Sequence, residues 1–265
     1  MSHNELDLSV YQASFLHRTF QNRMKKLEIA SVDDYQEYLN RTEEERNILE
    51  EELQVSYSAF FRNTLSFATL EHIVFPRLLQ RTVEAKAREL RIWSSACASG
   101  QECYSLAILL EEMLTKAPQP FTYRIFATDK SDAQIKQATM GSYPVEVIKS
   151  LSMERIQKWF TKQGETYTVL ERIKERIDFS TFDLFNQNLT CPPVSIFGDF
   201  DLIVCANLLF YFEPKHQQVI IDKVTRCLAP GSYLMSGETE RDLLLRQGFR
   251  EISFGSAIFE HKGVL

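Results

Sequence analysis

Apolar residues recur every three or four positions along the first part of the chain, which is the period of an amphipathic helix. This part, residues 6–82, contains no glycine. The helices that the pattern predicts cover residues 16–27, the stretch after the N-cap Ser31, residues 42–53 and, bent by Pro76, the stretch after Asn63. We therefore expect a small all-helical domain over residues 1–85.

From residue 90 onward the pattern changes to short apolar runs that alternate with helical stretches. The strands predicted in this part cover residues 91–95, 123–127, 177–182, 200–206 and 232–236. The helices between them cover residues 102–116, 132–140 and 214–228. This alternation predicts an α/β fold over residues 86–265, in which a mostly parallel, Rossmann-like sheet carries helices on both faces.

Two further stretches depart from this alternation. Residues 250–254 and 257–261 are joined by small residues, which predicts a closing antiparallel hairpin. The strand-like residues 166–170 predict a small insert near 161–176. A hairpin that closes an otherwise parallel sheet favours a methyltransferase over a dehydrogenase.

A strand, a tight turn and a helix follow one another within residues 91–105, whose sequence is RIWSSACASGQECYS. The turn consists of small side chains and ends in Gly100, so a ligand can approach its backbone and meet N–H groups at the start of the helix. Turns of this kind bind nucleotide-like cofactors. The G-x-G-x-x-G pattern is missing, which argues against a nicotinamide-dependent dehydrogenase.

Polar residues follow the next three strands at the carboxyl edge of the predicted sheet, where open α/β folds bind ligands. Asp129 ends the second strand, where an acidic residue hydrogen-bonds a ribose diol in Rossmann-like sheets. Asp183 follows the third strand and can accept a hydrogen bond from an adenine amino group. Asn207 and Tyr211 follow the fourth strand and are expected near the reacting end of a cofactor.

Composition and charge narrow the range of functions. The chain has 265 residues, 44% of them hydrophobic, and a formal net charge of −6. This acidic balance argues against nucleic-acid binding, because phosphates require a basic face. The N-terminus does not resemble a signal peptide and no apolar run is long enough to span a membrane. We therefore expect a cytoplasmic protein that does not insert into membranes.

The histidines and the five cysteines show no metal-ligand spacing, so no metal is expected. Cys97, Cys205 and Cys227 lie in or beside apolar segments. We interpret them as small buried thiols of a reducing compartment.

Basic residues concentrate near the N-terminus. Residues 8–27 contain no acidic side chain, but they include Arg18, Arg23, Lys25 and Lys26. A solvated helix face explains such a charge run as well as a docking surface for an acidic protein does. The docking surface would argue against a small-molecule methyltransferase, because only a macromolecular substrate needs one.

Four segments of the chain together resemble the chemotaxis-receptor methyltransferase (CheR) family in order and spacing. They are SAFFR at 58–62, WSSACASGQE at 93–102, ATD at 127–129 and CANLLFYF at 205–212. The similarity extends over nearly the whole chain, as far as Glu238 in the segment SGE.

The resemblance implies a class I methyltransferase sheet preceded by a small all-helical domain. It also implies transfer of a methyl group from S-adenosylmethionine, with S-adenosylhomocysteine as product, to glutamates on the cytoplasmic helices of a methyl-accepting chemoreceptor. The positions that match the family's cofactor contacts are Ser56, Ser58, Arg62, Glu102, Asp129, Asp183, Leu184, Ala206 and Asn207. Arg62 and Tyr211 match catalytic residues beside the methyl group, and the basic first helices match those that engage the receptor.

The chain departs from the family pattern at several of these positions. Ser56 and Ser58 replace asparagine and threonine, Asp183 replaces asparagine, and Ala206 replaces the arginine that precedes Asn207. The lost cation at Ala206 keeps open an alternative, a catalytically weak or silent relative that binds cofactor or receptor as a regulatory module. The stretch after Gly164 is short for the family's receptor-tail-binding β subdomain, so tail binding is not part of the expectation.

Overall fold

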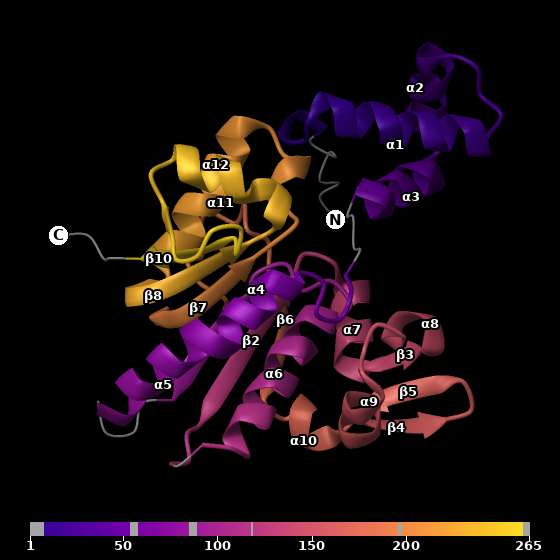
Figure 1. The fold of residues 1–265 in the computed structure, drawn as a ribbon. Coiled ribbons are helices and arrows are strands. Elements are labelled where there is room, and N and C mark those ends of the chain that lie inside the picture. Colours follow the sequence, from indigo (N-terminus) through magenta and orange to yellow (C-terminus); the bar gives the residue numbers. More distant parts are fainter. Residues whose placement is uncertain (1–7, 54–57, 85–88, 118, 196–197, 262–265) are drawn as a thin grey trace. The chain divides into compact units, whose positions relative to one another are not determined.

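The computed structural model describes residues 8–53, 58–84, 89–117, 119–195 and 198–261 (Figure 1). The chain divides into two compact units. The helical unit comprises Met1–Ser56 and Leu209–Gln218, and the sheet unit comprises Tyr57–Leu208 and Val219–Leu265.

Three helices make up most of the helical unit. They are α1 (Ala13–Lys26), α2 (Val32–Arg41) and α3 (Glu43–Leu53). The side-chain oxygen of Ser31 accepts a hydrogen bond from the N–H of Asp34 at 3.1 Å, so the predicted N-cap is confirmed. The unit also contains the 3₁₀ turns η1 (Leu8–Val10) and η3 (Leu209–Tyr211) and the start of α11 (Pro214–Arg226).

A buried ion pair joins α1 to α3. The Nε and Nη2 atoms of Arg23 donate to the two carboxylate oxygens of Glu45 at 2.8 and 2.6 Å, and the hydroxyl of Tyr35 donates to the same carboxylate at 2.8 Å. The Glu45 side chain is 2% exposed. The hydrogen bonds from Arg23 hold the pKa of Glu45 below its usual value. The three helices are therefore joined around one carboxylate.

This ion pair yields a stability prediction. Glu45→Gln leaves the buried Arg23 guanidinium with only its longer contact to Glu52, at 3.2 Å, so we expect a loss of up to about 3–5 kcal/mol in the free energy of unfolding at pH 7, measured by urea denaturation. Glu37→Gln is the control, because Glu37 pairs with Arg41 on the exposed face of α2 and its loss costs about 0–1 kcal/mol.

The pH dependence provides a second check of this ion pair. The pKa of Glu45 is lower in the folded than in the unfolded protein, so its stabilisation is present above the unfolded pKa of about 4.3 and is lost as pH falls through the folded pKa. The difference between wild type and Glu45→Gln must therefore shrink in acid. A difference that stays constant down to pH 2 would contradict this account.

The sheet unit contains a seven-stranded sheet with the order β6-β2-β1-β7-β8-β10-β9. The strands are β1 (Leu90–Ser94), β2 (Tyr123–Asp129), β6 (Ile177–Thr181), β7 (Phe200–Cys205), β8 (Leu228–Ser236), β9 (Arg250–Glu251) and β10 (Ile258–His261). The pairs from β6 to β8 are parallel, whereas β10 is antiparallel to both of its neighbours. The mostly parallel sheet with a closing antiparallel hairpin is therefore confirmed.

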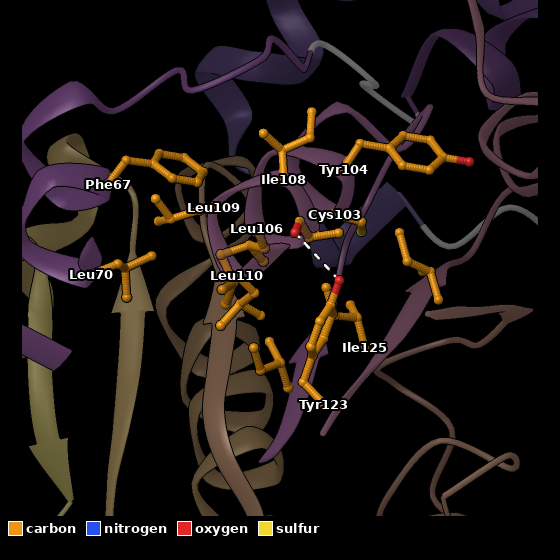
Figure 2. Packing of buried hydrophobic residues seen from close by; sticks show 14 of the residues in the cluster. Phe67, Leu70, Cys103, Tyr104, Leu106, Ile108, Leu109, Leu110, Tyr123 and Ile125 are labelled. Carbon is orange, nitrogen blue, oxygen red and sulfur yellow. Dashed lines mark hydrogen bonds between the residues drawn. The ribbon is translucent and has the colours of Figure 1, made fainter. Parts of the chain in front are cut away.

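Alternate residues of β1 point to opposite faces of the sheet, and each face has its own core. Ile92 belongs to the larger core, together with α6 (Gln101–Leu114), whose residues from Cys103 to Leu110 are all nearly inaccessible to solvent. Figure 2 shows these α6 side chains beside Tyr123 and Ile125 of β2. On the other face the Trp93 ring lies 5.5 Å from that of Phe200.

The predicted long helix after Asn63 consists of α4 (Thr64–Thr69), the π-helical turn η2 (Leu70–Val74) and α5 (Phe75–Glu84). The irregular turn immediately precedes Pro76, which has no N–H to complete the α-helical pattern. These helices belong to the sheet unit, and Nη2 of Arg81 contacts Oδ1 of Asp201 at 2.9 Å. The domain boundary at residue 85 stays a prediction. The contact of Arg81 in α5 with Asp201 in β7 argues for a boundary earlier in the chain.

The insert is larger than the range 161–176 suggests. It contains a second, antiparallel sheet in the order β3-β5-β4, formed by β3 (Ser142–Pro144), β4 (Phe160–Gln163) and β5 (Thr166–Val169). Three short helices flank these strands: α8 (Val145–Ile148), α9 (Met153–Trp159) and α10 (Glu171–Lys174). The remaining helices of the unit are α7 (Asp132–Met140), η4 (Glu238–Glu240) and α12 (Arg241–Arg246).

The interpretation of Cys227 as an isolated thiol is wrong. A disulfide joins Cys227 to Cys191, whose Cα atom lies 6.2 Å away although 36 positions separate the two residues in sequence. The loop after β6 returns to the end of α11, and sequence spacing gives no sign of this contact. Cys97 and Cys205 are free and buried, as expected.

Candidate functional site

The parallel strands of the sheet unit end at a common edge, and the loops after them carry most of the predicted cofactor residues. The loops follow β6, β2, β1, β7 and β8 in spatial order. The residues they bring to this edge are Asp183, Asp129, the turn at 95–100, Asn207 and Glu240.

The turn after β1 is fixed by both neighbouring strands. The N–H of Ser95 donates to the carbonyl of Val204 in β7 at 2.9 Å, and the N–H of Cys97 donates to the carbonyl of Thr128 in β2 at 2.8 Å. Gly100 has φ +93°, and a Cβ atom there would lie 3.0 Å from the Cβ of Ala138. Glycine is therefore required both by the backbone conformation and by the close approach of α7.

Asp129 links this turn to β2. One carboxylate oxygen accepts the N–H of Ala98 at 2.9 Å, and the other accepts the N–H of Ser131 at 2.9 Å. Burial raises the pKa of Asp129 above its usual value, while these hydrogen bonds act in the opposite direction. The backbone of Lys130 also hydrogen-bonds this carboxylate, so three of its roughly four lone-pair sites are used and one is left to accept a hydroxyl of a ribose diol.

Glu102 lies in the first turn of α6, where the hydroxyl of Ser94 donates to its carboxylate at 2.7 Å. Burial raises the pKa of Glu102 from 4.5 to about 7. The positive charge of Arg62 lowers this pKa, and the negative charge of Glu240 raises it. Glu102 is thus influenced by charged groups from two other segments of the sheet unit.

The segment that carries Arg62 is anchored by its two phenylalanines. The buried ring of Phe60 packs edge-on against Tyr143 and Phe160, with centroid distances of 5.1 and 5.6 Å. Phe61 has φ +49°, and its N–H donates to the hydroxyl of Ser105 in α6 at 3.0 Å. These contacts present Arg62 as an exposed side chain whose charge acts on Glu102.

Asp183 and Leu184 begin the loop after β6. One carboxylate oxygen of Asp183 accepts the N–H of Phe185 at 2.8 Å, and the other lies 3.9 Å from Nζ of Lys130. The Asp183 side chain is 40% exposed, so it can accept a hydrogen bond from a ligand. Leu184 is buried beside it.

Ala206 and Asn207 follow β7. Ala206 packs partly buried against the larger core, and Asn207 has φ +61°. Oε2 of Glu240 accepts the N–H of Asn207 at 2.9 Å and the N–H of Gly237 at 2.8 Å. Glu240 was not among the residues predicted from the sequence. A carboxylate three residues after a glycine at a strand end is a pattern that could have indicated it.

The remaining predicted residues are distributed over both units. Ser58 lies partly buried in the segment before Arg62, and Ser56 lies outside the described residues. Tyr211 belongs to the helical unit, where its ring lies 4.8 Å from that of Phe15. Its predicted position beside the methyl group stays a prediction.

The basic residues predicted to dock a partner differ in exposure. Arg18, Lys25 and Lys26 are exposed on α1, and Lys26 also contacts Glu52 at 2.7 Å. Arg23 is instead buried in its pair with Glu45. Its burial argues against a docking role, which stays a prediction for the other three.

The site carries an excess of negative charge. Its carboxylates belong to Asp129, Asp183, Glu102 and Glu240, and its cationic groups to Arg62 and Lys130. Such a site repels the pyrophosphate of a dinucleotide and suits a nucleoside ligand with positive charge. The described residues contain no group of three or more His, Cys, Asp or Glu side chains that can hold a metal ion.

The chain matches the profiles of two known domain families. The profile of the CheR methyltransferase, SAM binding domain, matches residues 56–255, and that of the CheR methyltransferase, all-alpha domain, matches residues 2–53. The chain belongs to the CheR family. Its cofactor is S-adenosylmethionine, which carries an ammonium and a sulfonium group and so fits the acidic site, and the protein is an S-adenosylmethionine-dependent methyltransferase.

Individual relatives of the CheR family support this assignment. A chemotaxis protein methyltransferase of Listeria innocua is 31% identical over 241 residues, which are 90% of this chain and 85% of that protein. The chemotaxis protein methyltransferase of Escherichia coli is 28% identical over 238 residues, 86% of this chain and 78% of that protein. An uncharacterized 104.1 kDa protein of Rhodobacter capsulatus is 29% identical over 97% of this chain, which spans only 26% of its length.

A separate hollow of about 680 Å³ lies at the other end of α6, away from the cofactor residues. Its lining includes Met113 and Lys116 near the end of α6 and Phe121 before β2. Because α6 begins at the turn after β1, its end lies away from the carboxyl edge of the sheet. This hollow is therefore not part of the CheR cofactor site.

Among the described helices, none is long and apolar enough to cross a bilayer.

The raised pKa of Glu102 predicts a pH-dependent cofactor affinity. We expect ionised Glu102 to attract the ammonium group of S-adenosylhomocysteine, so that below about pH 7 the carboxyl must first lose its proton. We expect the affinity, measured by calorimetry, to rise with pH up to about 7 by at most about tenfold per pH unit. In Glu102→Gln this rise should be absent and the affinity lower. A wild-type affinity that is constant from pH 5.5 to 8 would contradict the role of Glu102.

Proposed function

We propose that this CheR-family protein methylates glutamate side chains on the helical cytoplasmic domain of a chemoreceptor. The names of its relatives support the substrate class, since several are chemotaxis protein methyltransferases. The observation that carries the proposal is Arg62, an exposed guanidinium on an anchored segment whose charge acts on Glu102 in the cofactor site. Arg62 is suited to bind an incoming carboxylate.

The chemistry needs alignment and no general base. A glutamate side chain has a pKa of about 4.3 and is already ionised at pH 7. S-Adenosylmethionine, when bound, supplies a methyl group on a positively charged sulfur. The protein must bring the carboxylate oxygen to roughly 3–3.5 Å from that methyl group and exclude water from both charges. Arg62 holds the carboxylate, and the ring and hydroxyl of Tyr211 line the path of transfer.

The cofactor-binding roles follow the order of the strands. We assign Asp129 to the ribose diol, and Asp183 with Leu184 to the adenine, because they lie at the ends of β2 and β6. We assign Glu102 to the positively charged methionine part. The other residues proposed to contact the cofactor are Ser56, Ser58, Arg62, Ala206 and Asn207.

Transfer of a radiolabelled methyl group to a receptor fragment tests the roles of Arg62 and Tyr211. We expect Arg62→Ala to lower kcat/KM by about 100-fold, because a charged donor to the reacting carboxylate is lost, and Tyr211→Phe to lower it as well. Arg77→Ala, an exposed arginine on α5, is the control. The incorporated label must be released by mild base as methanol, because glutamyl methyl esters hydrolyse there. Base-stable label, or full activity of Arg62→Ala, would refute the proposal.

The exposed basic residues of α1 give a second test, directed at the receptor. Reversal of Arg18, Lys25 and Lys26 to glutamate should raise the KM for the receptor fragment about tenfold at low salt. The effect should shrink at high salt, while kcat and affinity for S-adenosylhomocysteine stay unchanged. Lys149→Glu, an exposed lysine of the sheet unit, is the control. An unchanged KM in the triple variant would exclude this surface as the docking site.

Ala206 favours a second candidate, a regulatory module with weak or no transferase activity. The site lacks the arginine that the resemblance leads one to expect before Asn207. Binding of S-adenosylhomocysteine without methyl transfer to any receptor fragment would support this candidate. Recovery of transfer in Ala206→Arg would then identify the missing cation as the cause. The cytoplasmic location stays a prediction under both candidates.

A further inference from the structure

Glu240 is a buried carboxylate at the end of β8 that the roles above do not include. Its side chain is 2% exposed. The same oxygen, Oε2, accepts the N–H of Gly237 at 2.8 Å and the N–H of Asn207 at 2.9 Å. One atom therefore joins the loop after β8 to the loop after β7. The strands β7 and β8 are neighbours in the sheet.

The residue held in this way has an unusual backbone. Asn207 has φ +61°, in the left-handed region that non-glycine residues seldom adopt. Asparagine adopts it more readily than most other residues, and contacts with neighbouring groups fix it in one position. The hydrogen bond from its N–H to Glu240 is one such restraint.

Gly237 supplies a second restraint, because Asn207 lies so close to it that no side chain fits there. A Cβ atom on Gly237 would lie 2.5 Å from Nδ2 and 2.8 Å from the backbone N of Asn207. Gly237 itself has φ −73° and ψ 153°, which any residue can adopt. Glycine is therefore required here by the close approach of Asn207 and of Oε2 of Glu240, which would lie 2.9 Å from the same Cβ atom.

We propose that Glu240 is a positioning residue, which together with Gly237 holds Asn207 against the methionine end of the bound cofactor. The inference rests on the proposed assignment of this edge as the cofactor site. The order of the strands shows which end of the cofactor is affected. Asp129 ends β2 and Asp183 follows β6, and both strands lie on the other side of β1 from β7 and β8, which precede Asn207 and Glu240. Glu240 also acts electrostatically on Glu102, which is assigned to the methionine part.

The test compares two ligands that differ at the methionine end. Binding of S-adenosylhomocysteine and of adenosine is measured by calorimetry on the full chain, together with thermal unfolding of each variant. We expect Glu240→Ala to weaken S-adenosylhomocysteine about tenfold, because the N–H of Asn207 loses its acceptor, and to change adenosine less than about twofold. Glu240→Gln should recover most of the loss, since an amide oxygen can accept the same N–H groups.

Two further variants separate positioning from general stability. Gly237→Ala displaces Asn207 without removing a charge, so it should reproduce the selective loss of S-adenosylhomocysteine affinity even if Glu240→Ala fails to fold. Glu238→Gln, an exposed glutamate on the same turn, should bind both ligands like wild type. In a double-mutant cycle, Glu240→Ala or Gly237→Ala should have little further effect once Asn207 is alanine.

Equal loss of both ligands in Gly237→Ala, additive effects with Asn207→Ala, or wild-type affinity of Gly237→Ala would each overturn the inference. The proposed receptor methylation fails by a different observation. A protein that binds S-adenosylhomocysteine with these selective losses, but transfers no methyl group to a receptor, would refute the substrate and retain Glu240. A wild-type protein that binds neither ligand would refute the site and with it the role of Glu240.

Discussion

The carboxylate of Asp129 connects the end of β2 to the turn after β1, and the shape of the proposed cofactor site depends on this connection. The hydrogen bond to Ala98 crosses 31 positions of sequence and reaches a residue with φ +47°. The parallel sheet makes it feasible, because adjacent strands in register end at the same height. The turn needs few glycines, since side-chain and main-chain acceptors from neighbouring strands hold its backbone in place.

A similar principle recurs across the sheet edge. In three places an oxygen atom on one strand or loop accepts a hydrogen bond from a backbone N–H on the neighbouring one. The acceptor–donor pairs are Val204 with Ser95, Asp129 with Ala98, and Glu240 with Asn207. The ligand-binding loops therefore owe their shape to contacts between strands more than to their own sequences.

The sequence allowed good prediction of features that depend on local periodicity and strand order. The strand ends, the cap at Ser31 and the position of Asp129 all follow from patterns within a few residues of each site. Features that depend on distant partners were missed. Arg23 belongs to a run of basic residues, but its partner Glu45 lies 22 positions away, so its charge was attributed to a surface. Cys191 and Cys227 are 36 positions apart in sequence, and Glu240 matters only because β8 lies beside β7.

The elevated pKa of Glu102 has a thermodynamic consequence for the empty site. Near neutral pH the protonated form of Glu102 is populated, which lowers the cost of keeping a carboxylate in a poorly solvated place. A cationic ligand then displaces that proton into the buffer. The heat measured on binding must therefore vary with the ionisation enthalpy of the buffer, and the slope of that variation counts the protons released from the protein.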